Sequence, residues 1–175
     1  MLTFLKIAIV GASGNVGQTL LKLLANKNVP ANQLYLLGSE KSAGQSVAYQ
    51  DQILTINLLS NFDFKNVDIA FFAAGSNVAA EYAPKAAEAG CYVIDKSSYY
   101  RLKDFIPLIV PEVNGDLLKK NNSKIISVPN CSTIQLVMAL KPLHDLAEIE
   151  RVEVATYQAV SGAGKTGSLK LQQEM

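Results

Sequence analysis

The residue best placed to do chemistry in this chain is a cysteine between an apolar run and a helical pattern. Cys131 lies in the segment Pro129-Asn130-Cys131-Ser132-Thr133, which follows the apolar residues of 125–128. At a strand-to-helix junction, backbone N–H groups and the helix dipole stabilise a thiolate, the nucleophilic form of sulfur. The alternative is a buried, inert cysteine, because free cysteines are among the most buried residues in proteins.

A glycine-rich turn near the start of the chain indicates a nucleotide site. Gly11-Ala12-Ser13-Gly14-Asn15-Val16-Gly17 follows an apolar run and opens an amphipathic stretch. Glycines in such a turn let the backbone approach a pyrophosphate that lies on the helix N-terminus. The spacing is GxxGxxG, not the simpler GxGxxG, so the prediction depends on the strand before and the helix after. A glycine turn that binds no ligand is the alternative.

The residues after the second expected strand indicate which dinucleotide is preferred. A carboxylate there hydrogen-bonds the ribose of NAD, whereas basic and hydroxyl groups suit the 2′-phosphate of NADP. Glu40 favours NAD, while the donors around it, Ser39, Lys41 and Ser42, favour NADP. The sequence therefore predicts a modest preference for NADP.

Two more strand ends carry residues that suit a ligand. Ala73-Ala74-Gly75 are small enough to let a cofactor lie across the carboxyl ends of the strands, although a plain strand-to-helix turn has the same composition. Arg101 follows the next strand, and arginine binds phosphate or carboxylate with two parallel hydrogen bonds. A solvated surface arginine is the alternative.

Two further motifs are weaker. Gly164-Lys165-Thr166 resembles the end of a triphosphate-binding loop, but Ala159 replaces the required first glycine, so we reject that interpretation. The segment can still approach a nicotinamide or a substrate. His144, the only histidine, lies about three helical turns beyond Cys131, too far to pair with the thiol.

The order of the elements predicts an α/β fold. Apolar runs without period-2 alternation, separated by amphipathic stretches, are typical of a parallel sheet covered on both faces. We therefore expect a Rossmann-type, doubly wound, mainly parallel sheet. Strands are predicted at 6–10, 34–37, 53–57, 69–73, 92–95, 108–110 and 124–127, with helices at 14–26, 78–89 and 132–146 and a short helical turn at 114–119.

A second domain is expected to begin near the cysteine. Residues 151–157 alternate polar and apolar, which predicts a half-exposed strand of a mixed or antiparallel sheet, and a helix is expected at 168–175. We assign 1–130 to a dinucleotide-binding domain and 131–175 to the start of an α+β catalytic and dimerisation domain. One strand and one helix cannot bury a core, so this second domain is expected to be incomplete as given.

The composition excludes several classes of protein. A net charge of +1 gives no electrostatic reason to bind nucleic acid or an anionic membrane, and no apolar run reaches the length of a membrane span. Cys91 and Cys131 are 40 positions apart and form no metal-type pair, so we expect no metal site. Two cysteines do not make a disulfide scaffold, which favours the cytoplasm.

Taken together, these residues resemble the aspartate-β-semialdehyde dehydrogenase family over nearly the whole chain. The resemblance rests on motifs in a fixed order: Gly11-Ala12-x-Gly14-x-Val16-Gly17, Glu81-Tyr82-Ala83-Pro84-Lys85-Ala86, Val110-Pro111-Glu112-Val113-Asn114, Pro129-Asn130-Cys131-Ser132-Thr133-Ile134-Gln135, Leu140-Lys141-Pro142-Leu143-His144-Asp145 and Thr156-Tyr157-Gln158-Ala159-Val160-Ser161-Gly162-Ala163-Gly164-Lys165. Asn130-Cys131-Ser132-Thr133 disfavours glyceraldehyde-phosphate dehydrogenases and acetylglutamyl-phosphate reductases, which surround their cysteine differently.

The resemblance implies NADP-dependent reductive dephosphorylation of aspartyl-4-phosphate to aspartate semialdehyde, on the route to lysine, threonine and methionine. It implies that Cys131 forms a thioester as phosphate leaves, that Gln158 orients this intermediate, and that Arg101 and Asn130 hold the phosphate. The residues that it implies contact NADP are Gly11, Ala12, Ser13, Gly14, Asn15, Val16, Ser39, Lys41, Ser42, Ala73, Ala74, Gly75, Ser161, Gly162, Ala163 and Gly164. It also implies a homodimer or tetramer.

The chain departs from the family pattern in residue type and in length. Lys96 stands where the family usually has Asn, and Lys41 where it usually has Arg. The general-base histidine and a substrate-binding arginine of the family lie beyond the matched part, so this chain alone is expected to have little turnover, though it can bind NADP. The alternatives are a non-catalytic NADP-binding half-protein and a related acyl-phosphate or semialdehyde reductase.

Overall fold

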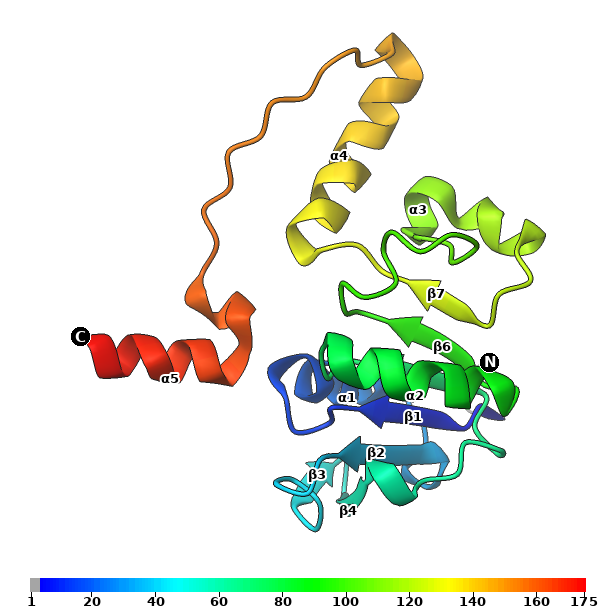
Figure 1. Ribbon diagram of the computed structural model, residues 1–175, viewed down its shortest axis with the longest axis vertical. Helices are drawn as coiled ribbons and strands as arrows, with labels where there is room; N and C mark the ends of the chain where they lie inside the picture. The colour runs from blue at the N-terminus through cyan, green and yellow to red at the C-terminus, as the bar shows by residue number, and fades with distance from the viewer. Residues whose placement is uncertain (1–3) are drawn as a thin grey trace.

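The core of the protein is a seven-stranded sheet with helices on both faces (Figure 1). The computed structural model describes residues 4–175, apart from the side chain of residue 165. Only β3 runs antiparallel to its neighbour, and all other pairs are parallel. In the order β3-β4-β2-β1-β5-β6-β7 the strands are Ser46–Tyr49, Gln52–Leu58, Leu34–Gly38, Ile7–Val10, Ile69–Phe72, Tyr92–Asp95 and Ile125–Ser127.

The central strand shows why the apolar runs do not alternate. All of β1 is buried, because each of its faces is covered by a helix. Ile7 and Ile9 pack in one apolar cluster with α1 (Asn15–Asn26), whereas Ala8 and Val10 pack in the other with α2 (Ser76–Glu88). The predicted doubly wound, mainly parallel α/β fold is confirmed.

Helix α1 lies against the sheet through a face that includes a glycine. Gly17, Leu21 and Leu24 are its buried residues, while Leu23 is more than half exposed. A Cβ at Gly17 would lie only 2.4 Å from the carbonyl oxygen of Gly11 and 2.8 Å from Cα of Ala12. Because no side chain fits between the helix and the turn, Gly17 fixes how closely α1 approaches β1.

Most predicted elements agree with the structure, but the strand predicted at 108–110 is wrong. Only Leu108 makes an isolated bridge, to Ser127. The side chain of Asn114 takes the backbone groups that a strand would use, accepting from Val110 N at 2.8 Å and donating to Leu108 O at 2.9 Å. The chain instead enters α3 (Pro111–Asn114) and a 3-10 helix, η4 (Gly115–Lys120). Strand β3 was not predicted.

The chain after β7 extends away from the sheet (Figure 1). Helix α4 (Cys131–Ala147) has no buried residue, and an extended segment leads from it to η5 (Val160–Ala163) and α5 (Gly164–Glu174). The strand predicted at 151–157 is wrong, because no segment of residues 4–175 pairs with it, and Tyr157 is almost fully exposed. Two further 3-10 helices are η2 (Ala31–Gln33) and η3 (Leu59–Asn61). None of the helices in the described part is long and apolar enough to cross a membrane.

The close approach at Gly17 predicts a specific loss of stability. Replacing Gly17 with Ala forces a methyl group against backbone atoms and should lower the free energy of unfolding by roughly 1–3 kcal/mol. Gly115→Ala is the matched control, because a Cβ there meets nothing closer than Pro111 Cβ at 3.8 Å. Urea denaturation followed by circular dichroism measures both, and equal stabilities for the two variants would contradict this account.

Candidate active site

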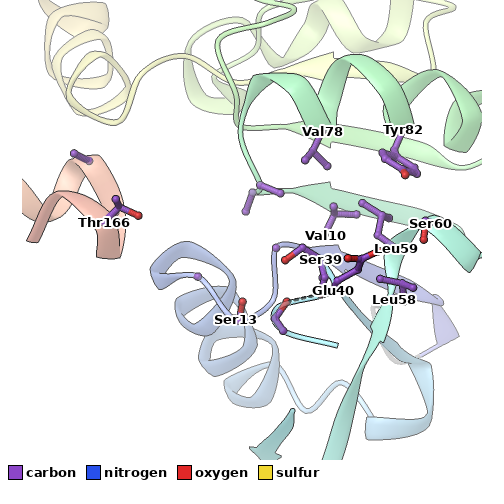
Figure 2. A pocket seen from close by; sticks show the side chains of 18 residues that line it. Val10, Ser13, Ser39, Glu40, Leu58, Leu59, Ser60, Val78, Tyr82 and Thr166 are labelled. Atoms are coloured by element: carbon purple, nitrogen blue, oxygen red, sulfur yellow. Dashed lines mark hydrogen bonds between the residues drawn. The ribbon is translucent and has the colours of Figure 1, made fainter. Parts of the chain in front are cut away.

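A groove of about 700 Å³ runs along the carboxyl ends of the parallel strands. It lies where the chain passes from β1 to β2 on one side and reaches β5 on the other, which is the usual ligand position in an open α/β sheet. Figure 2 shows Ser13 and Ser39 on the loops at its floor, Val78 and Tyr82 reaching down from α2, and Thr166 on a separate helix at its open side.

The glycine turn after β1 forms the part of the groove next to α1. Gly11 has φ of 88°, and a Cβ there would lie 2.8 Å from the carbonyl oxygen of Ala73, so glycine is required twice over. Both Gly11 N and Ala12 N donate to Leu37 O, which holds the turn against β2. Gly14, the residue before helix α1, gives it no side-chain cap, so the first turn of the helix can receive an anion such as a pyrophosphate.

The loop after β2 holds one of the predicted hydroxyl donors in its own turn. Ser42 is buried and its Oγ donates to Ser39 O at 3.2 Å, so it shapes the loop. Ser39 and Glu40 are exposed and line the groove, whereas the exposed Lys41 is not among the lining residues. Lys41, one of the three donors that favoured NADP in the sequence, therefore lies outside the lining of the groove.

One wall of the groove was not predicted from the sequence. Leu58, Leu59 and Ser60 follow β4, and Val78 and Tyr82 lie one turn apart on α2 (Figure 2). The available signal was positional: β4 is parallel to β2, so its end must reach the same edge of the sheet. For α2, the i, i+4 spacing of Val78 and Tyr82 places both side chains on one face of the helix, but the spacing does not tell which part of the protein that face contacts.

The segment that contains Cys131 begins α4 as expected. Cys131 is the first residue of the helix, and its side chain is exposed. Asn130 caps the helix: its Oδ1 accepts from Ser132 N at 3.1 Å and from Ser132 Oγ at 2.8 Å, with Cys131 Sγ at 3.5 Å. The cap fixes the thiol at the positive end of a 17-residue helix.

A glutamine from far along the chain meets this thiol. Gln158 Nε2 lies 3.7 Å from Cys131 Sγ. Gly162 makes room for it, since a Cβ on that residue would lie 2.1 Å from Gln158 Nε2. A few residues further on, Ala163, Gly164 and Thr166 line the groove. The segment 158–166 therefore joins the thiol to the groove.

Arg101 connects the loop after β6 to the short segment between β7 and the cysteine. Its Nε donates to Val128 O at 3.1 Å and its terminal nitrogen donates to Lys96 O at 3.3 Å. Asp95 stabilises the same loop from inside, because its buried carboxylate accepts from Ser97 N and from Ser97 Oγ. The arginine is thus held three residues before Cys131, with part of its guanidinium uncommitted.

The predicted site residues divide into those that line the groove, those at the thiol and those apart from both. Gly11, Ser13, Gly14, Ser39, Ser42, Ala73, Ala74, Ala163 and Gly164 line the groove. Asn130 and Gln158 contact Cys131, and Arg101 lies on the adjoining backbone. The remaining predicted cofactor residues are not in the lining: Ala12, Asn15, Val16, Lys41, Gly75, Ser161 and Gly162.

The other cysteine and the histidine lie in different environments. Cys91 is fully buried just before β6, and burial together with the nearby carboxylate of Asp68 raises the pKa of its thiol to about 12. His144 lies near the end of α4, where its Nδ1 accepts from Ile149 N, and about 20 Å of helix separates it from Cys131. Within the described residues, no three His, Cys, Asp or Glu side chains gather as metal ligands.

Most of this chain matches known protein families in sequence. Residues 6–121 match the semialdehyde dehydrogenase NAD-binding domain, and residues 140–174 match the semialdehyde dehydrogenase dimerisation domain. The aspartate-semialdehyde dehydrogenase of Rickettsia conorii is 51% identical over 162 residues, which are 92% of this chain and 48% of that protein. The chain thus spans about half the length of the curated relatives that it matches.

Solved structures give the same result. Aspartate semialdehyde dehydrogenase II of Vibrio cholerae, complexed with ASA, superposes with a TM-score of 0.90 at 45% identity, covering 97% of this chain and 51% of that one. The Candida albicans enzyme with NADP superposes with a TM-score of 0.65 at 27% identity, covering 82% of this chain and 48% of that one. The chain belongs to the semialdehyde dehydrogenase family, with its NAD-binding domain folded beside the cysteine that begins α4.

Proposed function

We propose that this chain carries the dinucleotide site and the nucleophile of an NADP-dependent aspartate-semialdehyde dehydrogenase. The observation that supports it most is the segment 158–166, which places Gln158 on the Cys131 thiol and Ala163 and Gly164 on the groove. A module that only binds a nucleotide needs neither the exposed thiol nor the amide beside it. The similarity to enzymes of this name over 92% of the chain supports the same activity.

The residues present fit a nicotinamide dinucleotide. The uncapped start of α1 suits the pyrophosphate, and the glycine at position 11 lets the backbone approach it. We propose NADP as the preferred cofactor because Ser39 lies in the groove, the exposed Lys41 follows two residues later in the chain, and a relative in the family is solved with NADP. When bound, the nicotinamide supplies or accepts the hydride at the carbon attached to Cys131 sulfur.

The chain's own residues account for acyl transfer. The Cys131 thiolate attacks the acyl carbon of aspartyl phosphate and forms a C–S bond. The bond between that carbon and the bridging oxygen then breaks, and phosphate leaves. With the hydride that a bound nicotinamide would supply, the thioester carbon would become a tetrahedral oxyanion, whose collapse breaks the C–S bond, gives the semialdehyde and returns the thiolate without uptake of a proton. The start of α4 stabilises the thiolate in both steps.

Three neighbouring side chains take the supporting roles. We assign Gln158 to orienting the thioester, since its amide Nε2 is already within reach of the sulfur. Arg101 and Asn130 would bind the phosphate. Arg101 would do so through the guanidinium N–H groups that do not donate to the carbonyl oxygens of Val128 and Lys96. This reaction lies on the route to lysine, threonine and methionine, and it would take place in the cytoplasm.

The remaining proposals concern domains and partners. We assign 1–130 to the NADP-binding domain and 131–175 to the start of the catalytic and dimerisation domain, which fits the dimerisation match over 140–174. A homo-oligomer is expected on that basis. Among the described residues no histidine is near enough to Cys131 to act as its base, so the 175-residue chain alone should turn over slowly.

Activity is tested directly by phosphate-dependent reduction of NADP with aspartate semialdehyde. The assay is run on the 175-residue chain and on any longer form that contains it, with NAD in place of NADP as a second arm. We expect turnover in the longer form and little turnover in the short chain. In the longer form, Cys131→Ala should lower the activity by about a hundredfold or more, because it removes the nucleophile. Unchanged activity of Cys131→Ala would refute the assignment of Cys131 as the nucleophile. Equal activity of the short chain and the longer form would refute the expectation that the short chain lacks a base.

The two cysteines differ enough to be distinguished by alkylation. At pH 8, iodoacetamide should modify Cys131, which is exposed. It should spare Cys91, because burial hides this thiol from the reagent and raises its pKa, so that it stays protonated. Peptide mass spectrometry of the native and the urea-unfolded chain locates the label. In urea both residues should react, and labelling of Cys91 at an equal rate in the native chain would contradict the structure.

A further inference from the structure

Arg101 offers an anion site that its own contacts leave only partly used. A guanidinium carries five N–H donors, and two of those of Arg101 are bound to the carbonyl oxygens of Val128 and Lys96. Both partners are neutral, and within residues 4–175 no carboxylate forms an ion pair with Arg101. The positive charge is therefore fixed in position and not neutralised.

Lys96 adds a second cation to the loop that carries Arg101. It follows β6 directly, its N–H continues the ladder by donating to Phe72 O at 3.0 Å, and its carbonyl oxygen is one of the two that hold Arg101. Lys96 is exposed, and in the described part of the chain its ammonium has no hydrogen bond or ion pair.

The nearest carboxylate in the sequence does not cancel this charge. Side chains alternate along a strand, so Lys96 continues the face of Ile94, opposite Val93 and Asp95. Asp95 is buried on that opposite face, where Ser97 N and Ser97 Oγ occupy its carboxylate. Lys103 is directed elsewhere, with its ammonium 5.2 Å from the ring centroid of Tyr99.

We propose that Lys96 supplies a second cation beside Arg101, so that this chain holds a doubly charged phosphate between an ammonium and a guanidinium next to Cys131. The inference rests on the proposed function for the identity of the phosphate as leaving group and co-substrate. The guanidinium gives a planar, oriented contact, and the flexible lysine adds a charge that follows the group as it leaves. Lys96 is on this account a phosphate-specificity residue.

The test on the chain itself uses Cys131 as the reporter. The rate of its alkylation by anionic iodoacetate, divided by the rate with neutral iodoacetamide, measures the local positive charge, and inorganic phosphate should protect against iodoacetate. We expect Lys96→Gln to lower this ratio and to weaken phosphate protection by about threefold each, the scale of an exposed charge pair. Lys96→Arg should restore both, and Lys103→Gln should change neither.

The outcomes separate this proposal from the proposed function. If Lys96→Gln left both the alkylation-rate ratio and the protection by phosphate unchanged, the proposal would be overturned. An equal effect of Lys103→Gln would also overturn it, because the positive potential would then come from the surface as a whole and not from Lys96. In the longer form, Lys96→Gln should raise the KM for phosphate and leave the KM for aspartate semialdehyde unchanged. A rise in the KM for NADP instead would place Lys96 at the cofactor. If phosphate protects through Lys96 but no form turns over, the dehydrogenase assignment fails and the phosphate site stands.

Discussion

Close backbone packing between the glycine turn, α1 and the turn after β5 sets the positions of the loops that form the groove. Gly17 lies against the carbonyl of Gly11, and Gly11 lies against the carbonyl of Ala73. With side chains at these positions, α1 would stand further from β1, and the turns after β1 and β5 would separate. The groove depends on this contact, since both turns line it. The sheet is therefore a scaffold that brings the loops of four parallel strands to one edge.

Two links, each between residues far apart in the sequence, connect Cys131 to this edge of the sheet. Arg101 binds the backbone before Cys131 to the loop after β6, and the segment 158–166 runs from the thiol to the groove. Neither link contributes to an apolar core, because α4 has no buried residue and α5 lies apart from the sheet (Figure 1). Their positions are set by polar contacts, which is the usual condition of a site that must admit substrate.

The sequence predicted the parts of the fold that a periodic pattern determines, and missed those that a single contact determines. Buried parallel strands such as β1 have continuous apolar runs, so their type and order were predicted. Residues 108–110 have the same composition, but the side chain of Asn114 takes their hydrogen bonds. Residues 151–157 alternate as a strand does, yet an alternating pattern cannot supply the partner strand that a ladder requires.

For the site, residue types at strand ends led us to expect the glycine turn, Arg101 and Cys131 at one edge, because parallel strands end there, whereas Asn130 was proposed from the family resemblance. The wall formed by Leu58, Leu59 and Tyr82 was missed, since apolar side chains in a helix or a loop carry no sign of the cavity that they face. That Gln158 reaches Cys131 came only from the family resemblance, and the contact at 3.7 Å gives it a physical basis. The burial of Ser42 in its own turn could not be read from its hydroxyl group.

The most direct measurement of the central claim is a single-turnover experiment in the absence of phosphate. The longest form of the protein is mixed with aspartate semialdehyde and excess NADP, NADPH is followed by absorbance, and the acid-quenched protein is mapped by peptide mass spectrometry. Without phosphate to release the acyl group, a burst of about one NADPH per active site is predicted, with an aspartyl thioester on the peptide that contains Cys131. Absence of the burst, or an acyl group on any other residue, would contradict the account.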